Sequence, residues 1–362
     1  MQKVIVRLGS NSYNVHIGPG LLMQCGPKLK EIGFSDKLVI ITDPIVKSLH
    51  GSTLKQSLSS SGFNVLMLEI PEGEEYKSLE TAGKLYQDLT EFYAERTTPI
   101  LALGGGIIGD IAGFVAATYL RGVPLIQIPT TLLAQVDSSI GGKVAVNHDQ
   151  LKNKIGAFYQ PRLVISDVTI LKTLPAKEVS DGLAEAIKYG VICDEELFTY
   201  IEKHLDQIKS LDDRALETIV FRSAKIKAEV VGKDERDFGM RNILNYGHTV
   251  GHAIESVSDF KVQHGEAVAI GMIAEARIAN KLGLLDNNTL TRLKNVIAGA
   301  GLPTKIPNLE LERLIQAMKH DKKILQGRIK FVLPKSIGEV SITDDVSPAL
   351  IEQALIEQND KT

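Results

Sequence analysis

Hydrophobic positions in the first half of the chain fall in short runs that alternate with amphipathic stretches. Strands that alternate with helices predict an α/β fold with a mostly parallel sheet covered on both faces. The first two runs, joined by Gly9-Ser10-Asn11, predict a hairpin at one sheet edge. The pattern predicts strands at residues 3–8, 12–17, 38–42, 64–70, 100–103, 124–128 and 163–166, and a helix such as 79–91 between them.

The pattern changes after Leu174-Pro175, where helical periodicity takes over. Helices are predicted at residues 177–189, 195–208, 213–231, 242–257, 266–279 and 289–298, followed by a late strand pair at 329–333 and 339–342. We therefore expect the 362 residues to divide near residue 173. Residues 1–173 would form the α/β domain, and residues 174–362 an all-α domain.

Charge and cysteine content exclude several classes of protein. The chain has 41 Lys and Arg against 44 Asp and Glu, so its net charge of −3 provides no field that would attract nucleic acid. Two distant cysteines suit a reducing cytoplasm rather than a disulfide scaffold. The apolar run 99–119 is long enough for a membrane span, but five glycines and Asp110 interrupt it. We expect a cytoplasmic protein without a membrane or nucleic-acid partner.

A glycine-rich turn suggests a nucleotide site. Gly104-Gly-Gly-Ile-Ile-Gly109 contains G-x-G-x-x-G between a predicted strand and a predicted helix, where backbone N–H groups can approach a pyrophosphate. The motif alone is a weak signal, since a tight turn also explains it. The acidic residue that usually follows about 20 positions later is missing. The nearest candidate, Asp43, ends an earlier strand, so the strand order should differ from that of the ordinary dinucleotide-binding fold.

Three histidines suggest a metal site. His248 and His252 are four residues apart on one predicted helix, and His264 opens the next. Thr249 stands where a zinc protease of H-E-x-x-H type has its glutamate, which disfavours that class. With Glu185, two of these histidines would leave a coordination position open, as catalytic zinc requires. The spacing does not say which two bind, and local hydrogen bonds are the alternative role for each.

Several cations occur in apolar or glycine-rich surroundings, which predict partial burial, and together they could bind an anionic small molecule. Lys227 taken alone is typical of a surface charge, and Asp137 would be the single acid of the group. The cations are Arg121, Lys143, Lys188, Lys227 and Arg241.

The longer segments that carry these residues resemble 3-dehydroquinate synthases over essentially the whole chain. The carrying segments are 104–110, 116–122, 129–143, 181–188, 244–255 and 264–272. The resemblance implies an N-terminal NAD-binding α/β domain, a helical metal- and substrate-binding domain and an active site between them. It implies conversion of 3-deoxy-D-arabino-heptulosonate 7-phosphate to 3-dehydroquinate and phosphate, the second step of the shikimate pathway. NAD⁺ would be used and regenerated through oxidation, phosphate elimination, reduction, ring opening and aldol closure.

The same resemblance implies roles for individual residues and a homodimer. The ligands of a divalent metal, zinc or cobalt, would be Glu185, His248 and His264. Catalysis and substrate contact would involve Arg121, Asp137, Lys143, Lys152, Asn153, Lys188, Lys227, Arg241, Asn245 and His252, with one of Lys322 and Lys323. NAD would contact Asp43, Glu72, Gly73, Glu74, Glu75, Tyr76, Lys77, Gly106, Ile107, Ile108, Gly109, Asp110, Thr130, Thr131, Lys143, Lys152, Ile170, Leu171, Lys172 and Thr173.

Two other enzyme classes fit part of this pattern. A related sugar-phosphate cyclase would keep the glycine turn and the metal ligands, but the full set of cations together with His252 favours the dehydroquinate enzyme. A metal-dependent alcohol or glycerol dehydrogenase would share the two-domain plan, but it would release NADH. A non-enzymatic nucleotide-binding protein would be expected to have lost ligands, and none is missing.

Overall fold

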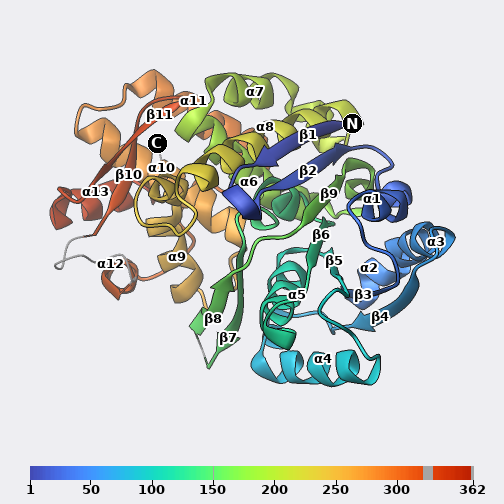
Figure 1. Ribbon diagram of the computed structural model, residues 1–362. Coiled ribbons are helices and arrows are strands. Elements are labelled where there is room, and N and C mark those ends of the chain that lie inside the picture. Colours follow the sequence, from blue (N-terminus) through green and yellow to red (C-terminus); the bar gives the residue numbers. More distant parts are fainter. Residues whose placement is uncertain (150, 321–328, 360–362) are drawn as a thin grey trace. The chain divides into compact units, whose positions relative to one another are not determined.

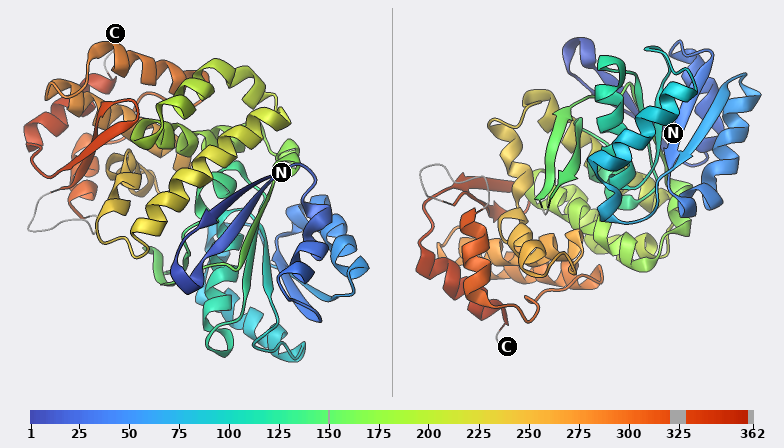
Figure 2. Two further views of the ribbon diagram at one scale, coloured as in Figure 1. Left: turned by 45° about the horizontal axis from the view of Figure 1, so that its top comes forward. Right: turned by 90° about the horizontal axis from the view of Figure 1, so that it is seen from below.

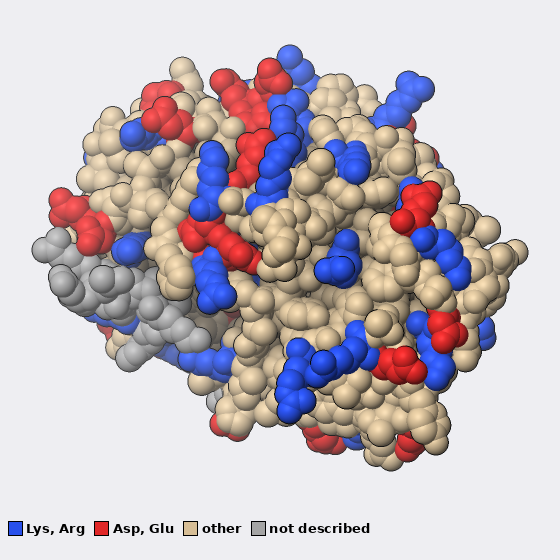
Figure 3. Space-filling view, in the orientation of Figure 1, with Lys and Arg blue, Asp and Glu red and all other residues tan. Residues whose placement is uncertain are grey.

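The computed structural model describes residues 1–149, 151–320 and 329–359 and contains two compact units (Figure 1). Unit 1 comprises Met1–Pro175 and Asp213–Arg236, and unit 2 comprises Ala176–Asp212 and Asp237–Thr362. Within the described residues, no helix combines the length and hydropathy needed to cross a bilayer. On the face shown in Figure 3, basic and acidic side chains are interspersed, which agrees with the small net charge.

Unit 1 is built on a seven-stranded sheet in the order β1-β2-β9-β6-β5-β3-β4. The first two strands form the expected antiparallel hairpin at an edge, and the other pairings are parallel. Each of the seven strands overlaps a predicted one. The strands are β1 (Gln2–Val6), β2 (Tyr13–Gly18), β3 (Lys37–Thr42), β4 (Asn64–Glu69), β5 (Ile100–Gly104), β6 (Leu125–Pro129) and β9 (Leu163–Asp167).

Apolar cores lie on both faces of this sheet. Successive residues of β3 point to opposite faces, so Val39 and Ile41 enter one core while Leu38 and Ile40 enter the other. Helices α4 and α5 contribute to the first core, and α1 and α3 to the second. The helices of this unit before residue 175 are α1 (Cys25–Glu31), α2 (Pro44–Val46), α3 (Ser52–Ser60), α4 (Leu79–Glu91) and α5 (Gly106–Thr118).

The order of the parallel strands confirms that this is not the ordinary dinucleotide-binding arrangement. From β4 the parallel strands run β4-β3-β5-β6-β9, which is the flavodoxin-like order 2-1-3-4-5. The chain leaves β3 toward β4 on one side and later builds outward from β5 on the other. Ligands of such sheets bind outside the carboxyl ends of the strands at this switch point.

A second hairpin, which the sequence pattern did not predict, packs against α5. It consists of β7 (Lys143–His148) and β8 (Leu151–Phe158), paired antiparallel. Only one row of its side chains, including Val144 and Val146, is buried, and the rest of the hairpin is polar or exposed. The helix comes so near that a Cβ on Gly113 would lie 2.3 Å from Val144 Cγ1. The apolar pattern of this hairpin is therefore too sparse to read from sequence.

The division of the chain differs from the one expected at residue 173. Unit 1 continues to Pro175 and also includes α8 (Asp213–Lys233), which the sequence pattern had assigned to the helical domain. This helix packs on β1 and β2, beside which it lies in both ribbon figures (Figures 1 and 2). Its position depends on tertiary packing that local periodicity does not encode.

Unit 2 is mainly helical, with a small antiparallel sheet formed by the expected late strand pair. The strands are β10 (Phe331–Ser336) and β11 (Glu339–Thr343). The helices are α6 (Ala176–Cys193), α7 (Glu195–Lys209), α9 (His248–Val257), α10 (His264–Lys281), α11 (Asn287–Gly299), α12 (Leu311–His320) and α13 (Pro348–Asn359).

Candidate active site

A glycine places His248, the first of the candidate metal-binding histidines, at the start of a helix. The single helix predicted over residues 242–257 is wrong: a 3-10 turn (Met240–Asn245) is followed by α9, which begins at His248. Between them Gly247 has φ of 78°, and its N–H donates to Glu275 Oε2 at 2.9 Å. A Cβ at Gly247 would lie 2.7 Å from the Val268 carbonyl oxygen. Only glycine therefore combines this backbone conformation with such close packing on α10.

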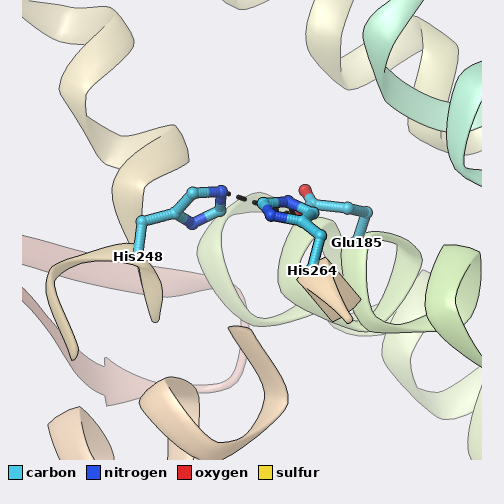
Figure 4. A group of neighbouring side chains, drawn as sticks. All are labelled: Glu185, His248 and His264. Carbon is cyan, nitrogen blue, oxygen red and sulfur yellow. Dashed lines mark ion pairs between the residues drawn. The ribbon is translucent and has the colours of Figure 1, made fainter. Parts of the chain in front are cut away.

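Three potential ligand atoms converge within unit 2. One atom each from Glu185 on α6, His248 on α9 and His264 on α10 lie within 4.8 Å of one another. Glu185 Oε1 is 3.4 Å from His248 Nε2 and 3.3 Å from His264 Nε2. Figure 4 shows the three side chains pointing toward one another. Among the described residues, His248 and His264 are the two histidines that converge with Glu185, a choice that histidine spacing left open, and their role as metal ligands stays a prediction.

The other atoms of these side chains also have partners. Lys188, one turn along α6, pairs with Oε2 of Glu185, so the two carboxylate oxygens face different groups. His248 Nδ1 lies 3.0 Å from the Tyr246 carbonyl oxygen, an acceptor that assigns the proton to Nδ1. The lone pair of His248 Nε2 is then directed toward Glu185 Oε1. This division leaves one oxygen and one imidazole nitrogen available to a cation.

The electrostatics of the cluster fit a divalent cation. Burial lowers the pKa of His264, but hydrogen bonds with Glu185 and Glu255 outweigh it and raise the pKa to about 10. Burial also raises the pKa of Asp181 to about 6, and its Oδ1 accepts the Gly265 N–H at 2.5 Å. A metal would take the place of the proton on His264 Nε2. Two imidazole nitrogens and one carboxylate oxygen suit zinc or cobalt, with a further position open.

His252 belongs to the cluster without being one of the three converging ligands. Its ring centroid lies 5.2 Å from that of His248, edge-on, and 6.5 Å from that of His264. It is partly exposed, on the turn of α9 that follows His248. Its contact with substrate stays a prediction.

Apart from Lys143 and Lys152 on the β7–β8 hairpin, the residues expected to contact NAD follow the carboxyl ends of five parallel strands in unit 1. Because the strands are parallel, these five groups lie along the same edge of the sheet. Asp43 follows β3, Glu72–Lys77 follow β4, Gly106–Asp110 follow β5, Thr130 and Thr131 follow β6, and Ile170–Thr173 follow β9.

The glycine turn at this edge has the form of a phosphate cradle. Gly105 is the N-cap of α5, and a Cβ on Gly104 would lie 2.6 Å from Ile108 Cβ. Beside it, the Thr130 hydroxyl is buried and has no hydrogen-bond partner among the described residues. Bare backbone at a helix N-terminus next to an unsatisfied hydroxyl fits an anionic group. Asp43 has a local role as well, since its Oδ1 caps α2 by accepting the Val46 N–H at 2.8 Å.

The β7–β8 hairpin is joined to the expected NAD loop by a polar network. Buried Lys77 donates to Asp110 Oδ2 at 2.6 Å and to Asn153 Oδ1 at 2.5 Å. Burial raises the pKa of Asp110, and the charge of Lys77 opposes that shift. Asn147 Nδ2 donates to Glu74 Oε1 at 2.8 Å. The sequence pattern did not predict the hairpin, and Asn147 was therefore not among the candidate residues.

Two family models of one enzyme match adjoining parts of this chain. Residues 67–181 match the family model for the N-terminal part of 3-dehydroquinate synthase, and residues 182–324 match the model for its C-terminal part. A protein from Dehalococcoides mccartyi named 3-dehydroquinate synthase is 51% identical over 346 residues, covering 96% of each chain. The chain belongs to the 3-dehydroquinate synthase family.

Solved structures of enzymes with other names share the fold of this chain. A 2-epi-5-epi-valiolone synthase from Streptomyces hygroscopicus subsp. jinggangensis 5008, with NAD⁺ and Zn²⁺ bound, has a TM-score of 0.89 and 30% identity over 96% of each chain. A 2-deoxy-scyllo-inosose synthase, complexed with carbaglucose-6-phosphate, NAD⁺ and Co²⁺, also has a TM-score of 0.89. It is 28% identical, covering 98% of this chain and 100% of the other.

The cations that the 3-dehydroquinate synthase resemblance singled out differ in burial. Lys227 is buried, against the surface role expected of it alone, and its Nζ donates to both the carbonyl oxygen and Oδ1 of Asp137 at 2.8 Å. Lys188 and Arg241 are buried in unit 2, where Asn245 Nδ2 donates to Asn242 Oδ1 at 3.3 Å.

The remaining candidates are more open to solvent. Arg121 and Lys143, for which the surrounding sequence predicted partial burial, are exposed in unit 1, so that prediction is wrong for them. Asn153 is also exposed, and Lys152 is partly exposed, 3.9 Å from Glu74 Oε2. Lys322 and Lys323 lie outside the described residues.

Two acids beside Glu185, His248 and His264 were not among the residues predicted from sequence. Asp181 lies one turn before Glu185 on α6, and Glu255 lies seven residues after His248 on α9. Both spacings place the acid on the same helix face as a ligand, which is the signal that could have found them.

Proposed function

We propose that this chain converts 3-deoxy-D-arabino-heptulosonate 7-phosphate to 3-dehydroquinate and phosphate, using NAD⁺ and Zn²⁺ or Co²⁺. The observation that carries the proposal is the convergence of Glu185 Oε1, His248 Nε2 and His264 Nε2 in a chain 51% identical to a 3-dehydroquinate synthase. The two cyclase structures, at 30% and 28% identity, contain NAD⁺ with Zn²⁺ or Co²⁺. The same cofactors are proposed here, since the donor set and the glycine turn fit them.

The reaction needs no net oxidant. When bound, NAD⁺ would take a hydride from the C5 carbon and return it, while the metal would act as a Lewis acid toward the substrate hydroxyls. Oxidation makes the neighbouring C–H acidic, so phosphate can leave by elimination. Reduction then restores the C5 alcohol, the ring opens, and an aldol step closes the carbocycle.

Residues of unit 2 hold the metal and transfer a proton near it. Lys188 fixes Glu185 Oε2, so Oε1 is the oxygen available for coordination. His252, outside the ligand set, is assigned to acid–base exchange with the substrate. Arg241 and Asn245 are assigned to the anionic and hydroxyl groups of the substrate.

Residues of unit 1 hold NAD⁺ and orient the substrate. The backbone from Gly106 would receive the pyrophosphate. Lys77 joins the NAD loop to Asn153 on the β7–β8 hairpin, which also carries the proposed substrate contacts Lys143 and Lys152. Asp137 and Lys143 are assigned to the nicotinamide and the substrate together, and Lys227, which is ion-paired with Asp137, is assigned to the substrate.

The main alternative is a related cyclase that acts on another sugar phosphate. The 51% identity to a 3-dehydroquinate synthase, against 30% and 28% to the two other cyclases, supports the heptulosonate substrate. An alcohol or glycerol dehydrogenase would produce NADH with turnover.

The deciding experiment supplies purified protein with NAD⁺, Zn²⁺ and the heptulosonate phosphate, and measures phosphate, 3-dehydroquinate and NADH. Phosphate and 3-dehydroquinate should form in equal amounts without net NADH. Glucose 6-phosphate, the natural counterpart of carbaglucose-6-phosphate, serves as the competing substrate. The proposal would be refuted if phosphate were released from glucose 6-phosphate and not from the heptulosonate phosphate, or if NADH accumulated.

The remaining expectations follow the same resemblance. A small phosphorylated sugar acid is the proposed partner, with no role for nucleic acid or membrane. A homodimer and a cytoplasmic location stay predictions, the first of which light scattering of the purified protein can test.

A further inference from the structure

His264 is held from both sides of its ring. Nε2 lies 3.3 Å from Glu185 Oε1, toward the metal cluster, while Nδ1 lies 3.4 Å from Glu255 Oε1. Glu255 is a buried acid near the end of α9, and it is not one of the three converging ligands.

The backbone at His264 is fixed independently of its ring. Gln263 and Glu266 form a reciprocal capping box at the start of α10, and the Gly265 N–H donates to Asp181 Oδ1. These contacts set the position of the Cα atom but leave the ring free to rotate about its side-chain bonds. On the side of the ring away from Glu185, the side chain that faces Nδ1 is Glu255.

We propose that Glu255 is a positioning residue for the metal: it accepts the Nδ1–H of His264 and so presents Nε2 to the cation. This inference rests on the metal site of the proposed function. His248 reaches the same tautomer through a neutral acceptor, the Tyr246 carbonyl. A carboxylate behind a ligating imidazole also makes that nitrogen a stronger donor, and loss of such a partner typically weakens metal binding about 10- to 100-fold.

Glu255 is placed behind the ligand and not among the ligands. Its Oε1 faces Nδ1, and Nδ1 and Nε2 lie on different sides of the imidazole ring. The three atoms that converge belong to Glu185, His248 and His264. A cation at that convergence would therefore have the His264 ring between itself and Glu255.

The test compares Glu255→Gln with the matched control Glu266→Gln. Both changes remove one negative charge near His264, but Gln at position 266 can still complete the capping box. Zn²⁺ and Co²⁺ affinities are measured on the full-length protein by competition with a chromophoric chelator, and the Co²⁺ visible spectrum reports ligand geometry. Glu255→Gln should bind about 10- to 100-fold more weakly with an altered Co²⁺ spectrum, and Glu266→Gln should match the wild type.

Wild-type affinity and spectrum in Glu255→Gln, or equal weakening in Glu266→Gln, would overturn the inference. A wild-type protein that binds neither metal would refute the proposed function as well, which separates the two failures. Should Glu255→Gln not fold, ¹⁵N-histidine NMR of the Zn²⁺-loaded wild type can test the inference, because it shows which nitrogen of His264 carries the proton. His264 should carry its proton on Nδ1, and coordination through Nδ1 would contradict the proposed role of Glu255.

Discussion

Replacing Lys188 by methionine should destabilise the metal-free protein more than the metal-loaded protein. Glu185 is completely buried, Lys188 is 2% exposed, and the two form an ion pair. Methionine keeps much of the lysine volume but leaves the carboxylate without its cation. Loss of one partner of a buried pair typically costs about 3–5 kcal/mol. For a unit of this size, that free energy corresponds to a decrease in melting temperature of roughly 6–20 °C.

A bound divalent cation would compensate the same carboxylate, so zinc should reverse part of the loss. The assay is thermal unfolding of Lys188→Met with chelator and with excess Zn²⁺. The double variant Glu185→Gln, Lys188→Met serves as control, because it removes both charges and should unfold nearer to the wild type without metal. Two results would refute this reasoning. The first is that metal-free Lys188→Met unfolds at the wild-type temperature. The second is that the metal-free double variant unfolds no higher than metal-free Lys188→Met.

Three further predictions concern the metal and the cofactor. Glu185→Ala and His264→Ala should each abolish both metal content and phosphate release; full metal occupancy by elemental analysis would contradict the ligand assignment. In denaturant titrations, the metal-free protein should lose stability as the pH rises from about 6.5 to about 10. The pKa of His264 is raised to about 10 in the folded protein, so the folded state binds this proton more tightly than the unfolded state, and the resulting stabilisation disappears over that pH range. Gly104→Ala should weaken NAD⁺ binding at least about tenfold by calorimetry, since its Cβ would lie 2.6 Å from Ile108; unchanged affinity would exclude the cradle.

The sheet of unit 1 could be predicted because its strands are short, apolar and bounded by turn residues. Buried strands such as β5 and β9 are apolar along most of their length, so their pattern is strong. The β7–β8 hairpin has one sparse apolar row, which local periodicity does not separate from loop. The break at Gly247 was missed because apolar spacing continues through it, while the conformation there is imposed by the packing of α10.

The candidate site shows the same division between local and tertiary information. His248 and His264 could be proposed from residue type and clustering, but their selection over His252 required the position of α6. Lys227 looks like a surface residue in its own segment, but it is buried and its partner Asp137 is 90 residues away. Contacts between distant segments have no signature in a single sequence.

The membership of α8 in unit 1 has a consequence for the gene. The chain leaves unit 1 after Pro175, returns to it for residues 213–236 and then leaves it again. A fragment ending at residue 175 would therefore lose Lys227 and uncover the side of β1 and β2 that α8 packs against. Neither unit is one continuous stretch of codons, so a single crossover cannot exchange one intact half of this protein for that of a relative.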